Sequence, residues 1–293
     1  METSPTIAEE IIGPDDAVRY LAHSNTNRHV REGVVTQYAR DMIKGRWHPS
    51  LIRFLSDGKL WDGQHRLRAI IISKTAQTFW VERNSSPDAL RSVDTGIKRT
   101  LGDALAISGE VHTNVLAGAI RIASHLETFP KMPPSAWARI PFSPDEVFAY
   151  LEKNADIRHS VQWAQNTLVR GLRYPPSLAA ALHFLEKRTN RPYADDFWNQ
   201  MASGAEMKIQ TGPFVLRKQV IEDRLKPRGT QWDQNMLTAV SIKAWNFWFQ
   251  DAPVKQLRWL RGAGEEFPVL GQKVSKKEYN DSNPEEVAEV TEE

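Results

Sequence analysis

One short stretch of this sequence constrains the fold more than any other. Two β-prone runs, Leu51–Leu55 and Lys59–Trp61, flank the pair Asp57-Gly58, and an Asp-Gly pair between such runs is a strong hairpin signal. The chain then passes through Asp62-Gly63 into an apolar pattern typical of a helix that starts near Gln64. The sequence therefore predicts a β-hairpin that continues through a tight turn into a helix.

A small mixed α/β domain is expected around this hairpin, over residues 25–100. Residues 34–43 have the apolar spacing of a helix, and Gly45 follows where a helix C-terminus favours a residue that tolerates positive φ. Residues 78–81 are typical of a further strand. Residues 1–24 carry only weak signals, so we treat them as an N-terminal extension.

From about residue 101 the strand signals stop and helical patterns follow one another, which predicts an all-helical domain over residues 101–272. The capping box Ser143-Pro144-Asp145-Glu146 marks one helix start. Further helices are expected at 114–126, 159–170, 177–187, 213–224 and 233–250. The predicted fold class is therefore α+β, a small mixed α/β N-terminal domain followed by an all-helical one. Residues 273–293, with three Lys and seven acidic residues, are expected to form a disordered acidic tail.

Composition excludes several kinds of protein. The chain contains no Cys, which excludes disulfides, thiol catalysis and thiolate metal sites and fits a reducing cytoplasm, where we expect the protein to reside. No apolar run is long enough to cross a bilayer, so no membrane association is expected. The histidines lack metal-ligand spacing, and no metal site is predicted from them. Outside the acidic tail the net charge is +6, which is compatible with DNA as a partner.

The turn after the hairpin has the residue types of an anion-binding site. The first amides of a helix point outward along a favourable dipole, and Gly63 allows a bound group to approach the backbone. Gln64 and His65 add hydrogen-bond donors, and Arg66 can direct two parallel hydrogen bonds at one phosphate. The alternative is a plain helix start, with Asp62 as N-cap and the cations in water. The spacing alone leaves both interpretations open.

The stretch from Asn25 to Lys74 resembles the ParB/sulfiredoxin superfamily. Asn27-Arg28 is similar to the short motif before the first helix of ParB-like domains, and residues 49–54 are similar to their following strand. The run from Gly63 to Ala69 resembles their Gly-x-x-Arg phosphate motif, and the spelling Asp-Gly-Gln-His-Arg is nearest to the DGQHR-type branch. The resemblance covers about a quarter of the chain and implies a ParB/sulfiredoxin-like fold for the first domain.

In that superfamily the turn holds the phosphates of CTP, ATP or ADP. The resemblance therefore implies a nucleoside triphosphate, CTP or ATP, as the cofactor. A nucleotide site could also recruit Mg²⁺ through Asp62 and the phosphates. The resemblance implies nucleotide contacts by Gly63, His65 and Arg66. We also expect Gln64 of the turn and Arg28 of the upstream motif to bind phosphate. The catalytic Cys of sulfiredoxin is absent from the turn, so sulfinic acid reductase activity is not expected. The third nucleotide motif of ParB is not recognisable downstream.

A second polar cluster, Asp94-Thr95-Gly96-Ile97-Lys98-Arg99, precedes the helical domain. Single basic residues in loops commonly meet only water, and that is one interpretation of this segment. The whole chain also resembles uncharacterised ParB-like proteins of actinobacteria and their phages, in which Asp-Thr-Gly-x-x-Arg recurs. This resemblance implies a role for Asp94 and Arg99, with Arg99 as a further phosphate-binding residue.

Three functions remain open at this point. The leading hypothesis is a nucleotide-binding, DNA-associated regulator or partition-like protein, in which the helical domain contacts DNA or a partner and the chain forms a homodimer. The second is an enzyme, either a phosphotransferase resembling the serine kinases of the superfamily or a nuclease, with Asp62 and His65 as catalytic residues or Glu82 as an alternative base. The third is a non-catalytic interaction protein of phages or mobile elements.

Overall fold

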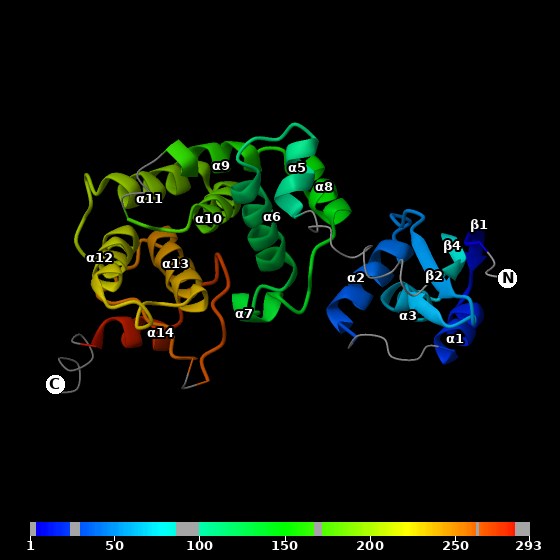
Figure 1. The fold of residues 1–293 in the computed structure, drawn as a ribbon. Helices are drawn as coiled ribbons and strands as arrows, with labels where there is room; N and C mark the ends of the chain where they lie inside the picture. The colour runs from blue at the N-terminus through cyan, green and yellow to red at the C-terminus, as the bar shows by residue number, and fades with distance from the viewer. Residues whose placement is uncertain (1–3, 24–29, 86–99, 167–171, 262–263, 285–293) are drawn as a thin grey trace. The chain divides into compact units, whose positions relative to one another are not determined.

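The structure, a computed structural model, describes residues 4–23, 30–85, 100–166, 172–261 and 264–284 (Figure 1). The chain divides into two compact units. Unit 1 contains Met1–Arg99 and Ala138–Glu146, and unit 2 contains Thr100–Trp137 and Val147–Glu293. A small mixed sheet occurs in unit 1 and helices make up unit 2, which confirms the predicted α+β class.

Unit 1 is built on a four-stranded sheet in the order β1-β4-β2-β3. Its strands are β1 (Thr6–Ile12), β2 (Leu51–Leu55), β3 (Leu60–Asp62) and β4 (Gln77–Ser85). β2 and β3 pair antiparallel across Gly58, which has φ 77, so the predicted hairpin is confirmed. β4 pairs antiparallel with β1 and parallel with β2, and it includes the predicted strand at residues 78–81.

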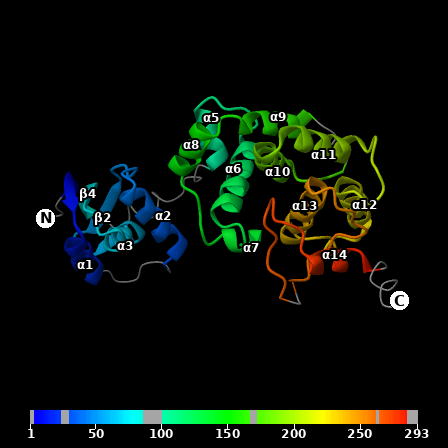
Figure 2. The ribbon, with the colours of Figure 1, turned by 180° about the vertical axis from the view of Figure 1, so that it is seen from behind.

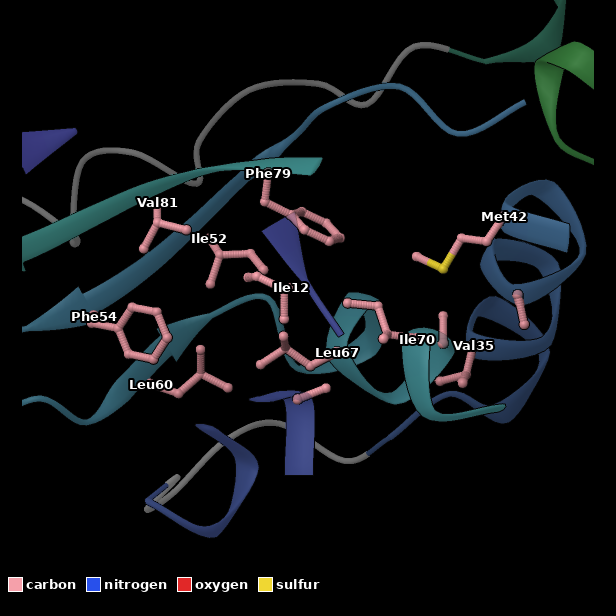
Figure 3. Packing of buried hydrophobic residues seen from close by; sticks show 13 residues of the cluster. Ile12, Val35, Met42, Ile52, Phe54, Leu60, Leu67, Ile70, Phe79 and Val81 are labelled. Atoms are coloured by element: carbon pink, nitrogen blue, oxygen red, sulfur yellow. The ribbon is translucent and has the colours of Figure 1, made fainter. Parts of the chain in front are cut away.

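Three helices cover one face of this sheet and form the core of unit 1. They are α1 (Pro14–Ala22), α2 (Glu32–Ile43) and α3 (Gln64–Ser73), and the last two confirm the helices predicted at residues 34–43 and from Gln64. Figure 3 shows strand side chains such as Phe79 and Ile52 directed toward Leu67 and Ile70 of α3. Along β2, and in the middle of β4, fully buried positions alternate with positions that keep part of their surface exposed, as this cover of one face requires.

The residues expected to be an N-terminal extension are part of this unit. They form β1 and α1, and the register of β1 places Thr6 to Ile12 opposite Arg83 to Gln77 of β4. Glu9 and Glu10 interrupt the alternating pattern that predicts a strand. In the fold, Glu10 forms an ion pair with Arg83 of β4, whose Nη2 lies 2.9 Å from Glu10 Oε2. The sequence signal for β1 is weak because Arg83, the partner of Glu10, is remote in sequence.

Residues 138–146 return to unit 1, although the sequence pattern assigned them to the helical domain. Arg40 of α2 donates to Pro141 O over 2.7 Å and to both carboxylate oxygens of Glu146 over 3.2 Å. Ser143 Oγ donates to Asp41 over 3.0 Å and accepts from Glu146 N over 3.2 Å. The predicted capping box is therefore confirmed as the start of a helix, and the same residues attach the segment to α2.

The regular elements among the described residues of unit 2 are all helices (Figures 1 and 2). Its helices are α5 (Leu101–Ile107), α6 (Thr113–Thr128), α7 (Pro134–Trp137), α8 (Pro144–Lys153, whose first residues belong to unit 1), α9 (Ile157–Asn166), α10 (Pro176–Thr189), α11 (Arg191–Ser203), α12 (Gly212–Leu225), α13 (Gln234–Phe249) and α14 (Lys276–Ser282). The helices predicted from 114, 143, 159, 177, 213 and 233 are confirmed, whereas α5, α7, α11 and α14 were not predicted. None of the described helices combines the length and apolar character needed to cross a membrane.

The C-terminal segment differs from the disordered tail expected from residue 273. Ser275 caps α14 by accepting a hydrogen bond from Glu278 N over 3.1 Å. Asn283 is fully buried, and its side-chain amide accepts from Lys255 N over 3.0 Å and donates to Pro253 O over 3.2 Å. The prediction of disorder from net charge is therefore wrong for residues 273–284, because a few polar side chains attach them to unit 2.

Candidate functional site

The candidate site lies at the turn between β3 and α3. Gly63 is the N-cap of α3 with φ 121 and ψ 1, and no described side chain accepts a hydrogen bond at this cap. A Cβ at Gly63 would lie 3.0 Å from Cγ1 of Ile52 in the sheet core. The turn therefore needs glycine for its backbone conformation and for its close approach to β2.

Replacing Gly63 by Ala is expected to lower the free energy of unfolding by about 2 to 3 kcal/mol, because positive φ and the contact with Ile52 both oppose a side chain. Chemical denaturation measures the change. Gly58→Ala is the matched control, since Gly58 also has positive φ, at 77, but a Cβ there meets nothing within 4 Å. Equal losses in the two variants would show that the approach to Ile52 contributes nothing.

Arg66 is directed at protein groups in this structure. Its Nη1 donates to the carbonyl oxygen of Leu51, and its Nη2 donates to Asp62 Oδ2 over 3.2 Å. The guanidinium thus joins the start of β2 to the turn. The sequence pattern predicts that the two parallel N–H donors of Arg66 bind a phosphate. In this structure the carboxylate of Asp62 and the carbonyl oxygen of Leu51 accept their hydrogen bonds.

Asp62 lies between two guanidinium groups. Arg53 Nη1 is 3.7 Å from Asp62 Oδ2, and Arg53 Nε donates to Glu82 over 3.0 Å. The result is a row of alternating charges, Glu82, Arg53, Asp62 and Arg66, that runs from β4 to the first turn of α3. The Asp62 carboxylate occupies the position in which two cations and a helix start would hold an anion.

His65 is oriented by the chain that leads into α2. The Arg31 backbone N–H donates to His65 Nε2 over 3.0 Å. Since Nε2 accepts this hydrogen bond, the neutral ring carries its proton on Nδ1. This tautomer suits a residue that hydrogen-bonds an anion better than one that removes a proton through Nε2.

The structure brings five of the seven predicted site residues into one turn, namely Asp62, Gly63, Gln64, His65 and Arg66. Arg28 and Arg99 lie outside the described residues. Arg53 was missed, because its place beside Asp62 follows from the pairing of β2 with β3, in which the two residues are direct partners. That register is the signal from which it could have been found.

Without a bound phosphate, this turn offers few oxygen atoms that could coordinate a metal ion. Among the described residues, no three His, Asp or Glu side chains gather as a metal-holding group. Asp62 offers one carboxylate, and two guanidiniums already compete for it. Mg²⁺ therefore stays a prediction that requires phosphate oxygens to complete its coordination.

Unit 2 contains an arrangement of Ser160, His183 and Asp195 that no sequence motif predicts. His183 of α10 lies 3.1 Å through Nδ1 from Ser160 Oγ and 3.1 Å through Nε2 from Asp195 Oδ1. Such a set can activate a serine, but Ser160 is only 1% exposed, so no substrate reaches its hydroxyl. We interpret it as a buried hydrogen-bond network that joins α9, α10 and α11.

Comparison of the chain with protein-family models, with curated proteins and with solved structures found no match. The resemblance of residues 25–74 to the ParB/sulfiredoxin superfamily therefore stays a prediction that rests on the quoted motifs.

Proposed function

We propose that unit 1 binds a nucleotide through its phosphates at the start of α3. The observation that carries the proposal is a glycine N-cap, at φ 121, flanked by the guanidinium groups of Arg66 and Arg53. A helix start supplies backbone N–H groups and a favourable dipole, and guanidinium groups match phosphate oxygens in shape and charge. Both kinds of donor are present within one turn.

Binding requires that the phosphate replace Asp62 as the partner of the two cations. The side chain of Asp62 is 42% exposed, so it has room to turn outward into water. A phosphate offers more acceptor oxygens and more negative charge than one carboxylate, which favours the exchange. In the absence of ligand, the negative charge of Asp62 offsets the repulsion between the guanidinium groups of Arg53 and Arg66.

The wider function that we propose is that of a DNA-associated, ParB-like regulator or partition-like protein that uses CTP or ATP. Two features support it: the motif order from Asn27 to Arg66, and the net charge of +6 outside the acidic C-terminal residues. Retention on duplex DNA is expected to weaken steeply as salt rises, because phosphate contacts release counterions.

Thermal denaturation with CTP, ATP, ADP and inorganic tripolyphosphate tests the phosphate site. A ligand at about 100 times its Kd stabilises the native state by about 2.7 kcal/mol, which raises Tm measurably. We expect Arg66→Ala to abolish the rise. Arg68→Ala is the matched control, since Arg68 is an exposed cation on the same helix, and it is expected to retain the rise. No Tm shift with any of these ligands contradicts the proposal.

Asp62→Asn tests the exchange at the same site. If Asp62 only occupies the anion position, the variant is expected to bind tripolyphosphate without Mg²⁺ several-fold more tightly than the wild type, because the competing charge is gone. If Asp62 instead holds Mg²⁺, the variant loses the Mg²⁺-dependent part of nucleotide binding. Weaker binding in both conditions contradicts the exchange.

The enzyme hypothesis is separated from this proposal by turnover. Purified protein is incubated with ATP or CTP, Mg²⁺, and nucleic acid or hydroxyl acceptors, with Asp62→Asn and His65→Gln beside the wild type. Consumption that both variants lose supports a phosphotransferase or nuclease. Nucleotide binding without consumption supports the regulator, and neither binding nor consumption leaves the non-catalytic interaction protein.

A further inference from the structure

The outer edge of strand β1 is open to a further strand. β1 is the end strand of the sheet order β1-β4-β2-β3 (Figure 1). All seven of its residues pair with β4 in one uninterrupted register, and among the described residues no backbone hydrogen bond runs from β1 to any other segment. Alternate N–H and C=O groups of an edge strand point away from the sheet. Those of β1 are therefore available to a partner.

β1 lacks the usual protection of an edge strand. Natural edge strands avoid unwanted pairing through short length, a lysine, a proline or a β-bulge. β1 has seven residues, contains neither lysine nor proline, and keeps its register with β4 without a break. Ile7 is 63% and Ile11 is 74% exposed, and both lie on the same face of the strand. A long, regular edge with exposed apolar side chains is a template for strand pairing.

Glu9 decides which strands fit this edge. It is exposed, lies between Ile7 and Ile11 on one face of the strand, and has no ion-pair partner among the described residues. The neighbouring Glu10, by contrast, is bound by Arg83 of β4. If two copies of β1 paired antiparallel with Ile7 opposite Ile11, Glu9 would face Glu9, and like charges directly opposite each other are destabilising. The edge therefore favours a strand with a central Lys or Arg over a second β1.

A second acidic group follows where β1 ends. An open hollow of about 660 Å³ lies at the start of α1 and is lined by Gly13, Pro14, Asp15, Asp16, Val18 and Arg19. Asp16 is paired with Arg19, whereas Asp15 is exposed and has no ion-pair partner among the described residues. Val18 adds an apolar side chain that is 54% exposed. An extended chain that runs along β1 past Ile12 therefore reaches a hollow with an unpaired carboxylate.

We propose that the edge of β1 binds an extended, basic segment of a partner protein as a fifth strand of the sheet. Main-chain hydrogen bonds supply the affinity in this mode of recognition, and alternate side chains supply the specificity. In an antiparallel register, apolar residues of the segment lie opposite Ile7 and Ile11. A Lys or Arg between them lies opposite Glu9, and basic residues that precede them approach Asp15. The site is separate from the proposed phosphate site, because β1 and β3 are opposite edges of the sheet.

Fluorescence anisotropy of the full chain with the labelled peptide Lys-Lys-Thr-Val-Thr-Lys-Thr-Val-Thr tests the proposal. Its central Lys faces Glu9 when its two Val residues face Ile11 and Ile7. The wild type is expected to bind this peptide with Kd below about 500 µM. Glu9→Lys is expected to raise Kd about tenfold, because an attraction becomes a repulsion. A second peptide, with Glu in place of the central Lys, is expected to bind Glu9→Lys more tightly than the wild type. Misfolding of the variant cannot produce that reversal.

Glu32→Lys is the matched control, because Glu32 is an exposed carboxylate of the same unit that belongs to α2. It is expected to retain the wild-type Kd for both peptides. The first peptide with an N-methylated backbone lacks N–H donors and is expected not to bind. Amide hydrogen exchange of residues 6–12 is expected to slow when the unmodified peptide binds. A wild-type Kd above about 500 µM overturns the proposal. So does binding that the N-methylated peptide retains, or that Glu9→Lys and Glu32→Lys weaken equally.

Discussion

Replacing Glu186 by Gln is expected to raise the free energy of unfolding at pH 8 by about 4 kcal/mol. Glu186 of α10 is fully buried, and its carboxyl group accepts a hydrogen bond from Trp198 Nε1. Its other oxygen, Oε1, is buried and has no hydrogen-bond partner among the described residues. Burial raises the pKa of this carboxyl to about 8, against the smaller opposite effect of the hydrogen bond from Trp198.

The direction of the effect follows from where the proton is bound. In the unfolded chain Glu186 ionises near pH 4.5, whereas in the folded chain it keeps its proton up to about pH 8. Its contribution to stability is therefore complete below pH 4.5 and is lost as pH rises toward 8, at about 1.4 kcal/mol per pH unit. Gln has the same shape and never ionises, so the variant is expected to lose this decline.

Urea denaturation at several pH values between 4.5 and 8 measures the change. Glu152→Gln is the control, because Glu152 is an exposed carboxylate of α8 and its replacement should leave the pH dependence as it is. A Glu186→Gln variant that follows the wild type in parallel over this range would falsify the assignment of the decline to Glu186.

Much of the fold of unit 1 is predictable because its signals are local. The hairpin needs only Asp57-Gly58 between two β-prone runs, and α3 needs only the apolar spacing after Gly63. β1 and α1 were not predictable in this way, since Glu10 in the strand makes sense only beside Arg83, far along the chain. Residues 138–146 join unit 1 through Arg40 for the same reason. Ion pairs between distant segments leave no periodic pattern in a sequence.

The candidate site shows the same division. The position of Gly63 at a helix start could be predicted, because strand, turn and helix signals follow one another directly. The direction of Arg66 could not be predicted, since its partners are the carbonyl oxygen of Leu51 and the carboxylate of Asp62. Neither could the presence of Arg53, which depends on strand register. Residue type thus predicts which groups can bind a phosphate, and tertiary contacts decide which partners they have without one.

Acid is expected to destabilise the protein through His183, by about 3 kcal/mol between pH 6.5 and pH 4. Burial lowers the pKa of this imidazole to about 4, although the hydrogen bond with Asp195 acts in the opposite direction. The ring also stacks on Trp163 at 4.5 Å between centroids. Because the unfolded chain takes up a proton near pH 6.5 and the folded chain does not, the contribution of His183 is complete above pH 6.5 and is lost as pH falls toward 4.

Wild-type measurements alone would hide this loss. His183 and Glu186 lie one turn apart on α10, and between pH 4.5 and 6.5 their contributions change by similar amounts in opposite directions. The two groups together are therefore expected to leave stability nearly constant there and to lower it by about 2 kcal/mol between pH 6.5 and 8, where Glu186 alone of the two acts.

Single variants separate the two groups. Glu186→Gln is expected to lose stability as pH falls from 6.5, and His183→Gln is expected to gain it, because each leaves the other group unopposed. His159→Gln, at an exposed histidine of α9, is the control and should retain the flat profile. If the doubly substituted chain still changes in stability across this range, other titrating groups are responsible, and the buried pair on α10 does not set the pH response of unit 2.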